Sequence, residues 1–180
     1  MPAFGPFDAR LLVLGLAPGL RGANRSGRPF TGDHAGQLLY ATLLRHGLAA
    51  GRYAEHAGDR LRLIDCRVSN AVRCVPPDNK PTGAEIAQCR PFLQAELAAM
   101  PRLAAVLALG RIAHDQLLAA LGRSPRQFLF GHGVRHALPE GPTLYDSYHC
   151  SRYNTQTGRL TPAMFEAVLA RIRQELFSGS

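Results

Sequence analysis

The chain has 180 residues, 46% of them hydrophobic, which suits one domain with a real core, expected over residues 1–180. No apolar run approaches the ~20 residues of a membrane span and no signal peptide opens the sequence, so a membrane protein is excluded and a cytoplasmic monomer is expected. The formal net charge of +8 favours a polyanionic partner, and nucleic acid is the best candidate.

Apolar runs and helix signals alternate along the chain. The residue pattern predicts strands over 11–15, 61–65, 68–72, 103–109 and 143–148. It predicts helices over 32–46, 82–100, 111–121 and 162–176, with a capping box at Thr82 and Glu85 and a proline at the first position of the last helix.

This alternation predicts an α/β fold, namely a three-layer α/β/α sandwich around a central, mainly parallel, four-stranded sheet. Ligands of such sheets bind beyond the carboxyl ends of the strands. The loops 15–33, 74–82 and 149–161 all leave strand ends on that side. They therefore hold the best candidates for chemistry.

The first loop, GLAPGLRGANRSGRPFTGD, combines glycines with charged and aromatic side chains. Asp33 either favours the helix dipole or is catalytic, and the glycine-rich loop before it favours catalysis. Phe30 either fills the core or stacks on a planar base. Two of the loop's arginines, Arg25 and Arg28, are candidates for phosphate contacts.

The other two loops each offer one polar candidate. Asn79, in CVPPDNKP, either makes an ordinary turn or uses its amide, with a donor beside an acceptor, to read the edge of a base. His149 follows the last predicted strand. It is either structural or donates to an oxygen that gains negative charge.

The segment after His149 reads CSRYNTQTGRLT and is polar and basic. It is either a solvated loop or a contact with the phosphate backbone of a nucleic acid, with Arg152 or Tyr153 entering the base stack. Ser151 and Asn154 belong to the same candidate contact. This pattern alone leaves both interpretations open.

These three loops together resemble the uracil-DNA glycosylase superfamily, most closely its family 5 (type b) enzymes, over roughly residues 10–176. The resemblance implies a monofunctional hydrolase that excises uracil, and also other deaminated bases such as hypoxanthine, from DNA in base-excision repair. It places the family's active-site aspartate on Asp33, its uracil-reading asparagine on Asn79 and its motif histidine on His149. Phe30 matches the stacking aromatic, and the backbone amides of Gly15 and Ala17 are candidate base contacts.

The cysteines depart from the family pattern. Related enzymes carry a 4Fe-4S cluster, which is not needed for the chemistry, held by four cysteines. Cys74 and Cys89 match the two later ligands, whereas the two earlier ones, expected before the first strand, have no counterpart. We therefore expect either a true start further upstream or a shortened member without a complete cluster. Cys150 replaces a proline of the family, which leaves a thiol near the site, and Cys66 lies at a position that is not a family position.

Two other functions compete with the glycosylase. The first is a catalytically silent homologue that binds DNA, which the intact Asp33, Asn79 and His149 disfavour. The second is a nucleotide-binding α/β domain unrelated to DNA. It predicts a lysine in the phosphate loop, and the first loop has none.

Overall fold

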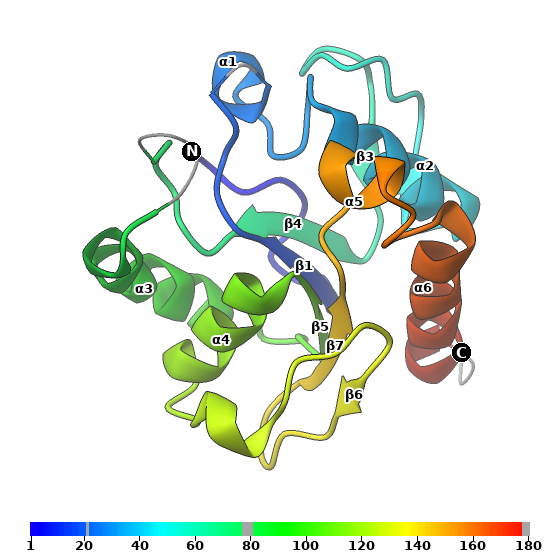
Figure 1. The fold of residues 1–180 in the computed structure, drawn as a ribbon. Coiled ribbons are helices and arrows are strands. Elements are labelled where there is room, and N and C mark those ends of the chain that lie inside the picture. The colour runs from blue at the N-terminus through cyan, green and yellow to red at the C-terminus, as the bar shows by residue number, and fades with distance from the viewer. Residues whose placement is uncertain (21, 77–80, 178–180) are drawn as a thin grey trace.

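A computed structural model describes residues 1–20, 22–76 and 81–177. Its main sheet has the strand order β4-β1-β5-β7-β6 (Figure 1). Four strands are parallel: β1 (Leu11–Gly15), β4 (Cys66–Asn70), β5 (Ala105–Leu109) and β7 (Thr143–Ser147). The prediction of four parallel strands is confirmed, and a short antiparallel fifth strand, β6 (Arg135–His136), extends the sheet at β7.

Helices cover both faces of this sheet. α3 (Gly83–Ala98) and α4 (Arg111–Ala120) cover one face, and α2 (His34–Arg45) and α6 (Pro162–Phe177) cover the other (Figure 1). Strand β1 is buried on both faces: Leu11 and Val13 belong to the core under α2 and α6, and Leu12 and Leu14 to the core under α3 and α4. The predicted three-layer sandwich is confirmed, and such two-sided burial explains the continuous apolar run.

The predicted strands over 61–65 and 68–72 differ from the observed ones. A single strand, β4, occupies Cys66–Asn70, while β3 (Arg62–Leu63) pairs with β2 (Ala49–Ala50) in a separate hairpin. The apolar pattern failed because Arg67 and Ser69 are buried polar residues. Both bond to the carboxylate of Glu96 on α3, at 2.7 and 2.6 Å, which satisfies them inside the protein.

Short helices occur where the sequence predicts only loops. α1 (Ala23–Ser26) lies in the first loop, the 3₁₀ helix η2 (Pro125–Gln127) precedes β6, and α5 (Arg152–Gln156) follows β7. Ser151 caps α5 by accepting a hydrogen bond from the Asn154 N–H at 3.4 Å. None of the α5 residues is buried, so no apolar periodicity indicates this helix. The predicted capping box of α3 is confirmed.

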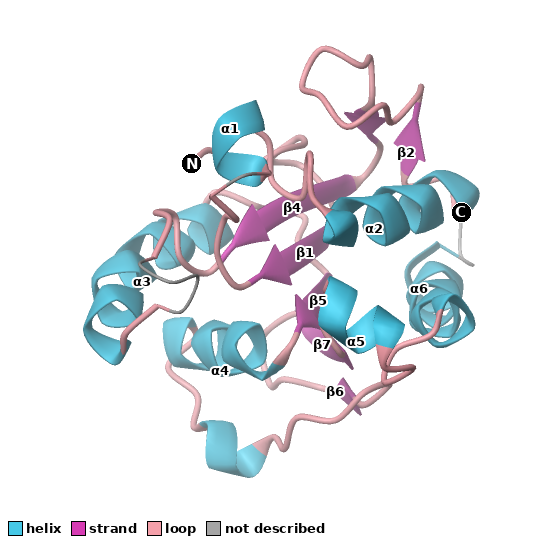
Figure 2. Ribbon diagram, turned by 45° about the horizontal axis from the view of Figure 1, so that its top comes forward, coloured by secondary structure: helices cyan, strands magenta, loops and turns pink. Residues whose placement is uncertain are grey.

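The topology creates a crevice at the carboxyl edge of the sheet. β1 pairs with β4 on one side and β5 on the other, and the intervening helices α2 and α3 cover opposite faces. Loops that follow β1 and its neighbours therefore diverge at this switch point, where ligands bind in such sheets. Figure 2 shows the arrowheads of β1 and β4 pointing to the same edge. Among the described residues, no helix is long and apolar enough to cross a membrane.

Candidate active site

A cavity of about 930 Å³ opens at this carboxyl edge. Loops from three strands and the start of α2 form its walls, and the size is typical of a small-molecule pocket. Four features combine in it: a carboxylate, an aromatic ring, an amide and an imidazole. The lining residues that carry them or surround them are Leu16, Ala17, Pro18, Gly19, Ala23, Phe30, Asp33, His34, Ala35, Asn70, Pro81, Ile112, His149, Ser151, Arg152 and Tyr153.

Asp33 is the N-cap of α2. Its Oδ1 accepts a hydrogen bond from the Gly36 N–H at 3.0 Å, which fixes the carboxylate at the start of the helix. A Cβ at Gly19 would lie 3.9 Å from Oδ2, so the second oxygen faces the glycine-rich loop. Burial raises the pKa of the carboxyl above its ordinary value. One oxygen thus holds the helix while the other is available to a ligand.

Phe30 forms an aromatic wall beside Asp33. Its backbone has a φ of +54°, which is unusual for a bulky residue, and its side chain is buried. The ring lies against Gly15, where a Cβ would come within 2.4 Å of its Cζ atom. It also lies roughly parallel to the His149 ring, with centroids 6.0 Å apart and planes inclined by 29°. Gly15 therefore leaves the space that the aromatic wall requires.

Asn70 brings an amide to the floor of the same cavity. It is the last residue of β4 and is 4% exposed. Its Oδ1 has no hydrogen-bond partner among the described residues, and a Cβ at Gly15 would lie 2.5 Å from that oxygen. A buried acceptor without a partner costs about 1–3 kcal/mol, so a donor from a ligand is the natural partner.

Sequence reasoning missed Asn70 because it placed the strand at 68–72, which puts this residue in the middle of a strand. The signal that could have found Asn70 is its place at the end of β4. A polar side chain that ends a strand next to β1 faces the crevice. Asn79, the asparagine predicted for base reading, lies outside the described residues.

His149 follows β7 and faces Phe30 across the cavity. Burial lowers the pKa of its imidazole to about 4, so the ring is neutral near pH 7. The Asn154 Nδ2 donates to the His149 carbonyl oxygen at 2.8 Å, which ties the backbone at the histidine to α5. Cys150 is fully buried in the core under α2 and α6, and burial, together with the nearby Asp33 carboxylate, raises the pKa of its thiol to about 12.

This depressed pKa gives a test of His149. The pKa is 6.5 for an ordinary histidine and about 4 in the folded protein, so between these pH values the unfolded state binds more protons. We expect the stability contributed by the neutral ring to be complete above about pH 6.5 and to be lost as the pH falls towards 4. Melting curves of the native protein and of His149→Gln at about pH 7 and about pH 5 measure this. If acid lowers the melting temperature equally in both proteins, the assignment of this pH effect to His149 is contradicted.

Exposed residues of α5 line the cavity, and α1 contributes the buried Ala23 to its wall. Tyr153 is 71% exposed, Arg152 and Arg25 are exposed, and α5 lies beside α2 (Figure 2). The His34 Nε2 and Thr155 Oγ1 atoms, 2.9 Å apart, join these two helices. The predicted DNA-contact residues on α5 thus lie next to the predicted catalytic ones.

The prediction that Arg28 contacts phosphate is wrong. Arg28 is 4% exposed and its guanidinium makes two hydrogen bonds, both 2.8 Å long, to the carboxylate of Asp59. A cation paired in this way inside the protein is not offered to a DNA backbone. The pairing could not be predicted, because Asp59 lies 31 positions away in the sequence, between β2 and β3.

Two groups of side chains are possible metal ligands: the four cysteines, and a cluster of two histidines and an aspartate. Cys66 and Cys150 are fully buried in the hydrophobic core, which leaves Cys74 (exposed) and Cys89 (buried) as the available thiols. A 4Fe-4S cluster takes four thiolates, so the cysteines of this sequence do not fit a complete cluster. We expect anaerobically purified protein to contain no stoichiometric iron and sulfide; chemical analysis that finds four of each per chain would overturn this.

The second cluster is His114, His136 and Asp146, outside the cavity. The His114 Nδ1 lies 2.7 Å from Asp146 Oδ1, and its Nε2 lies 2.8 Å from the Phe128 carbonyl oxygen. Burial alone would lower the pKa of His114, yet the bond to Asp146 raises it. Each ring nitrogen of His114 already has a protein acceptor, so we interpret this cluster as a structural ion pair.

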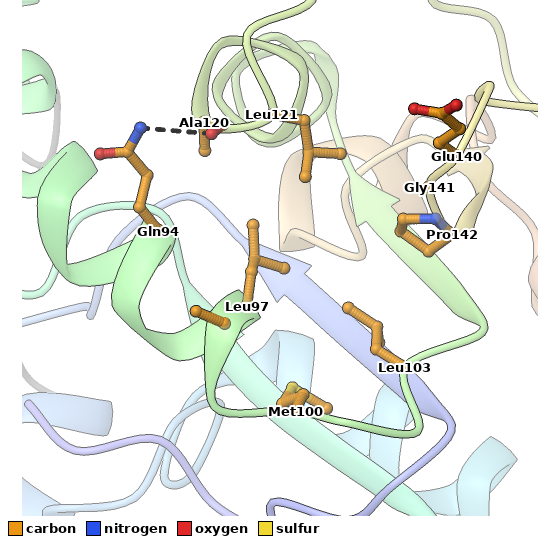
Figure 3. Close-up of a pocket in the computed structure, with 10 residues that line it drawn as sticks. Gln94, Leu97, Met100, Leu103, Ala120, Leu121, Glu140, Gly141 and Pro142 are labelled. Atoms are coloured by element: carbon orange, nitrogen blue, oxygen red, sulfur yellow. Dashed lines mark hydrogen bonds between the residues drawn. The ribbon is translucent and has the colours of Figure 1, made fainter.

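A further hollow of about 640 Å³ lies between the C-terminal ends of α3 and α4 (Figure 3). Leu97, Met100, Leu103 and Leu121 give it an apolar lining. Leu103 precedes β5, so this hollow lies at the amino edge of the sheet, opposite the edge where ligands bind. We assign no chemistry to it.

Comparison with known proteins shows the family of this chain. A family model described as "Uracil DNA glycosylase superfamily" matches residues 2–173. The chain is 47% identical to a Type-5 uracil-DNA glycosylase of Thermus thermophilus, over 97% of this chain and 79% of the relative. It is 43% identical to one of Mycobacterium bovis (97% and 66%) and 40% identical to one of Pyrobaculum aerophilum (95% and 74%).

Proposed function

Because this chain belongs to the uracil-DNA glycosylase superfamily, we propose that it hydrolyses the N-glycosidic bond of uracil in DNA, as part of base-excision repair. The observation that carries the proposal is the convergence of Asp33, Asn70, Phe30 and His149 on one cavity at the carboxyl edge of the sheet. The names of the type-5 relatives support uracil as the base. That the protein acts as a cytoplasmic monomer stays a prediction from the sequence.

The base leaves the DNA stack to enter this cavity, since a glycosidic bond inside a duplex is out of reach. Phe30 stacks on the flipped ring. Asn70 offers to N3–H of uracil its Oδ1, which has no partner in the described part of the chain, and it offers its Nδ2 to O4, a complementary donor and acceptor pair. The same pairing is impossible for cytosine, which has an unprotonated N3 and an amino group. The cavity volume of about 930 Å³ leaves room for a larger deaminated base such as hypoxanthine.

Bond cleavage places the electron pair of the N1–C1′ bond on uracil and leaves a cationic sugar. The Asp33 carboxylate stabilises that cation, orients a water molecule towards C1′ and accepts the proton which the water loses. The neutral His149 ring donates an N–H to the uracil oxygen that becomes negative. Preorganised groups of this kind contribute about 10²–10³ each to the rate. Every group in this scheme belongs to the chain itself.

The α5 surface supplies contacts with DNA. We expect Tyr153→Ala to weaken binding to uracil-containing DNA by about 1–3 kcal/mol, because an exposed aromatic ring at the cavity mouth stacks on an unpaired base. Phe92→Ala is the matched control, since Phe92 is 61% exposed but lies on α3. Fluorescence anisotropy with labelled DNA measures both. Equal affinities of the two variants would refute a role for Tyr153.

Release of the base itself tests the function. The protein is incubated with DNA that contains one uracil, and free bases are identified by mass spectrometry. Uracil is expected, and thymine from the same DNA is not. DNA binding without any released base would favour the catalytically silent homologue, which no observation on the site supports.

A further inference from the structure

A buried ion pair outside the cavity, between Arg28 and Asp59, holds the loop 28–33, which carries Phe30 and Asp33. The two guanidinium nitrogens of Arg28 each donate to one oxygen of Asp59 at 2.8 Å, and the Arg28 Nε donates to Thr31 Oγ1 at 2.8 Å. Asp59 also accepts from the backbone N–H groups of Ala54 and Leu61, at 2.8 and 3.1 Å. Burial would raise the pKa of Asp59, yet these bonds hold it far below its usual range.

An aromatic box surrounds the same guanidinium. The Arg28 Cζ atom lies 5.1, 5.6 and 5.7 Å from the ring centroids of Phe4, Tyr40 and Tyr53. At these distances the ring faces attract a cation, most strongly where water is absent. Arg28 is therefore fixed in both position and orientation.

The two tyrosines of the box also hold the loop backbone. The Tyr40 hydroxyl donates to the Pro29 carbonyl oxygen at 2.6 Å, and the Tyr53 hydroxyl donates to the Phe30 carbonyl oxygen at 3.1 Å. On the other side, a Cβ at Gly36 would lie 1.6 Å from that same Phe30 oxygen, so α2 packs directly against it. The left-handed backbone of Phe30, at φ +54°, is thus held from two directions.

Strained backbone of this kind persists only where the surroundings determine it, and it is common where a side chain must be aimed. We propose that Arg28 and Asp59 are positioning residues for base excision: their buried pair holds the Phe30 ring and the Asp33 carboxylate in the arrangement that receives the flipped base. This proposal rests on the proposed function. Neither residue lines the cavity, so neither touches the base.

Three substitutions of graded severity test it. Tyr53→Phe keeps the ring of the box and removes the hydroxyl that bonds to the loop backbone at the Phe30 carbonyl. Arg28→Lys keeps the charge but loses the two-pronged bond to Asp59, and Asp59→Asn removes the charge of the acceptor. Arg45→Lys is the matched control, because Arg45, the last residue of α2, forms an exposed ion pair with Glu166 of α6. All are assayed well below their own melting temperatures.

Three quantities are measured: the single-turnover excision rate, inhibition by free uracil, and affinity for undamaged duplex. For Arg28→Lys, Asp59→Asn and Tyr53→Phe we expect a rate lower by roughly 10–10²-fold and weaker inhibition by uracil, since small misplacements at a reacting centre have effects of this size. Affinity for undamaged duplex is expected to match that of the native protein. Arg45→Lys is expected to behave as the native protein in all three.

Lower melting temperatures with native rates and native uracil inhibition would overturn the positioning role and leave a purely structural one. A loss confined to duplex affinity would also overturn it, and would make Arg28 a DNA contact. A native protein that releases no uracil would instead contradict the proposed function. In that case the uracil inhibition assay has no activity to report on, so binding of free uracil by calorimetry compares the same variants, and equal affinities overturn the positioning role.

Discussion

Asp33→Asn is expected to lower the rate of uracil excision by about 10²–10³-fold, with little change in the free energy of unfolding. Asparagine is as good an N-cap as aspartate, so the bond to the Gly36 N–H at the start of α2 is retained. The substitution removes only the negative charge that stabilises the cationic sugar and accepts a proton. Single-turnover kinetics and a melting curve of the same preparation measure the two effects separately.

Asp33→Ala is the comparison variant, because alanine loses both the charge and the cap. It should show the same loss of rate together with a destabilisation of about 1 kcal/mol. If Asp33→Asn retains the native rate, the carboxylate is only a helix cap. The elevated pKa of Asp33 also predicts that activity declines on the acid side at a pH above the ordinary carboxyl value.

The second large effect is expected at Asn70. Asn70→Ala should lower excision of uracil by about 10²-fold or more, because a site built to hydrogen-bond a base loses that recognition entirely. The same change should leave the melting temperature unchanged or raise it, since the Oδ1 atom has no hydrogen-bond partner to lose among the described residues. Loss of function without loss of stability is the mark of a group that is reserved for a ligand.

Asn79→Ala, made in parallel, distinguishes the two asparagines. If only Asn70→Ala lowers the excision rate, the residue that recognises the base is the one at the end of β4. A loss at Asn79 alone, with a native rate for Asn70→Ala, would contradict the role proposed for Asn70 and support the resemblance-based prediction. Undamaged duplex serves as the control ligand, since neither change should alter its affinity.

Much of the fold could be predicted because its two central strands, β1 and β5, are apolar on both faces. The apolar runs of β1 and β5 have no other stable place than the centre of a covered sheet. The failures share one cause: β4 and α5 are stabilised by polar contacts and not by an apolar periodicity. Arg67 depends on Glu96, and α5 depends on the cap at Ser151 and on His34 of α2.

The candidate site was predicted in part. The topology argument identified Asp33, Phe30 and His149, and the structure brings all three to one cavity. Asn70 was not predicted, because the polar residues of β4 hide where this strand ends, and the role of Asn70 depends on its being the last residue of the strand. The prediction for Arg28 is wrong because a cation in a glycine-rich loop suggests a phosphate contact, and the sequence does not show that Asp59 is its buried partner.

The most direct measurement is a single-turnover excision assay on a labelled duplex with one central uracil, followed by alkali, with the native protein and Asp33→Asn side by side. We predict cleavage at the uracil position by the native protein and about 10²–10³-fold slower cleavage by the variant. No cleavage by a native protein that still binds the duplex would contradict the proposed glycosylase, and equal cleavage by both would contradict the role of Asp33.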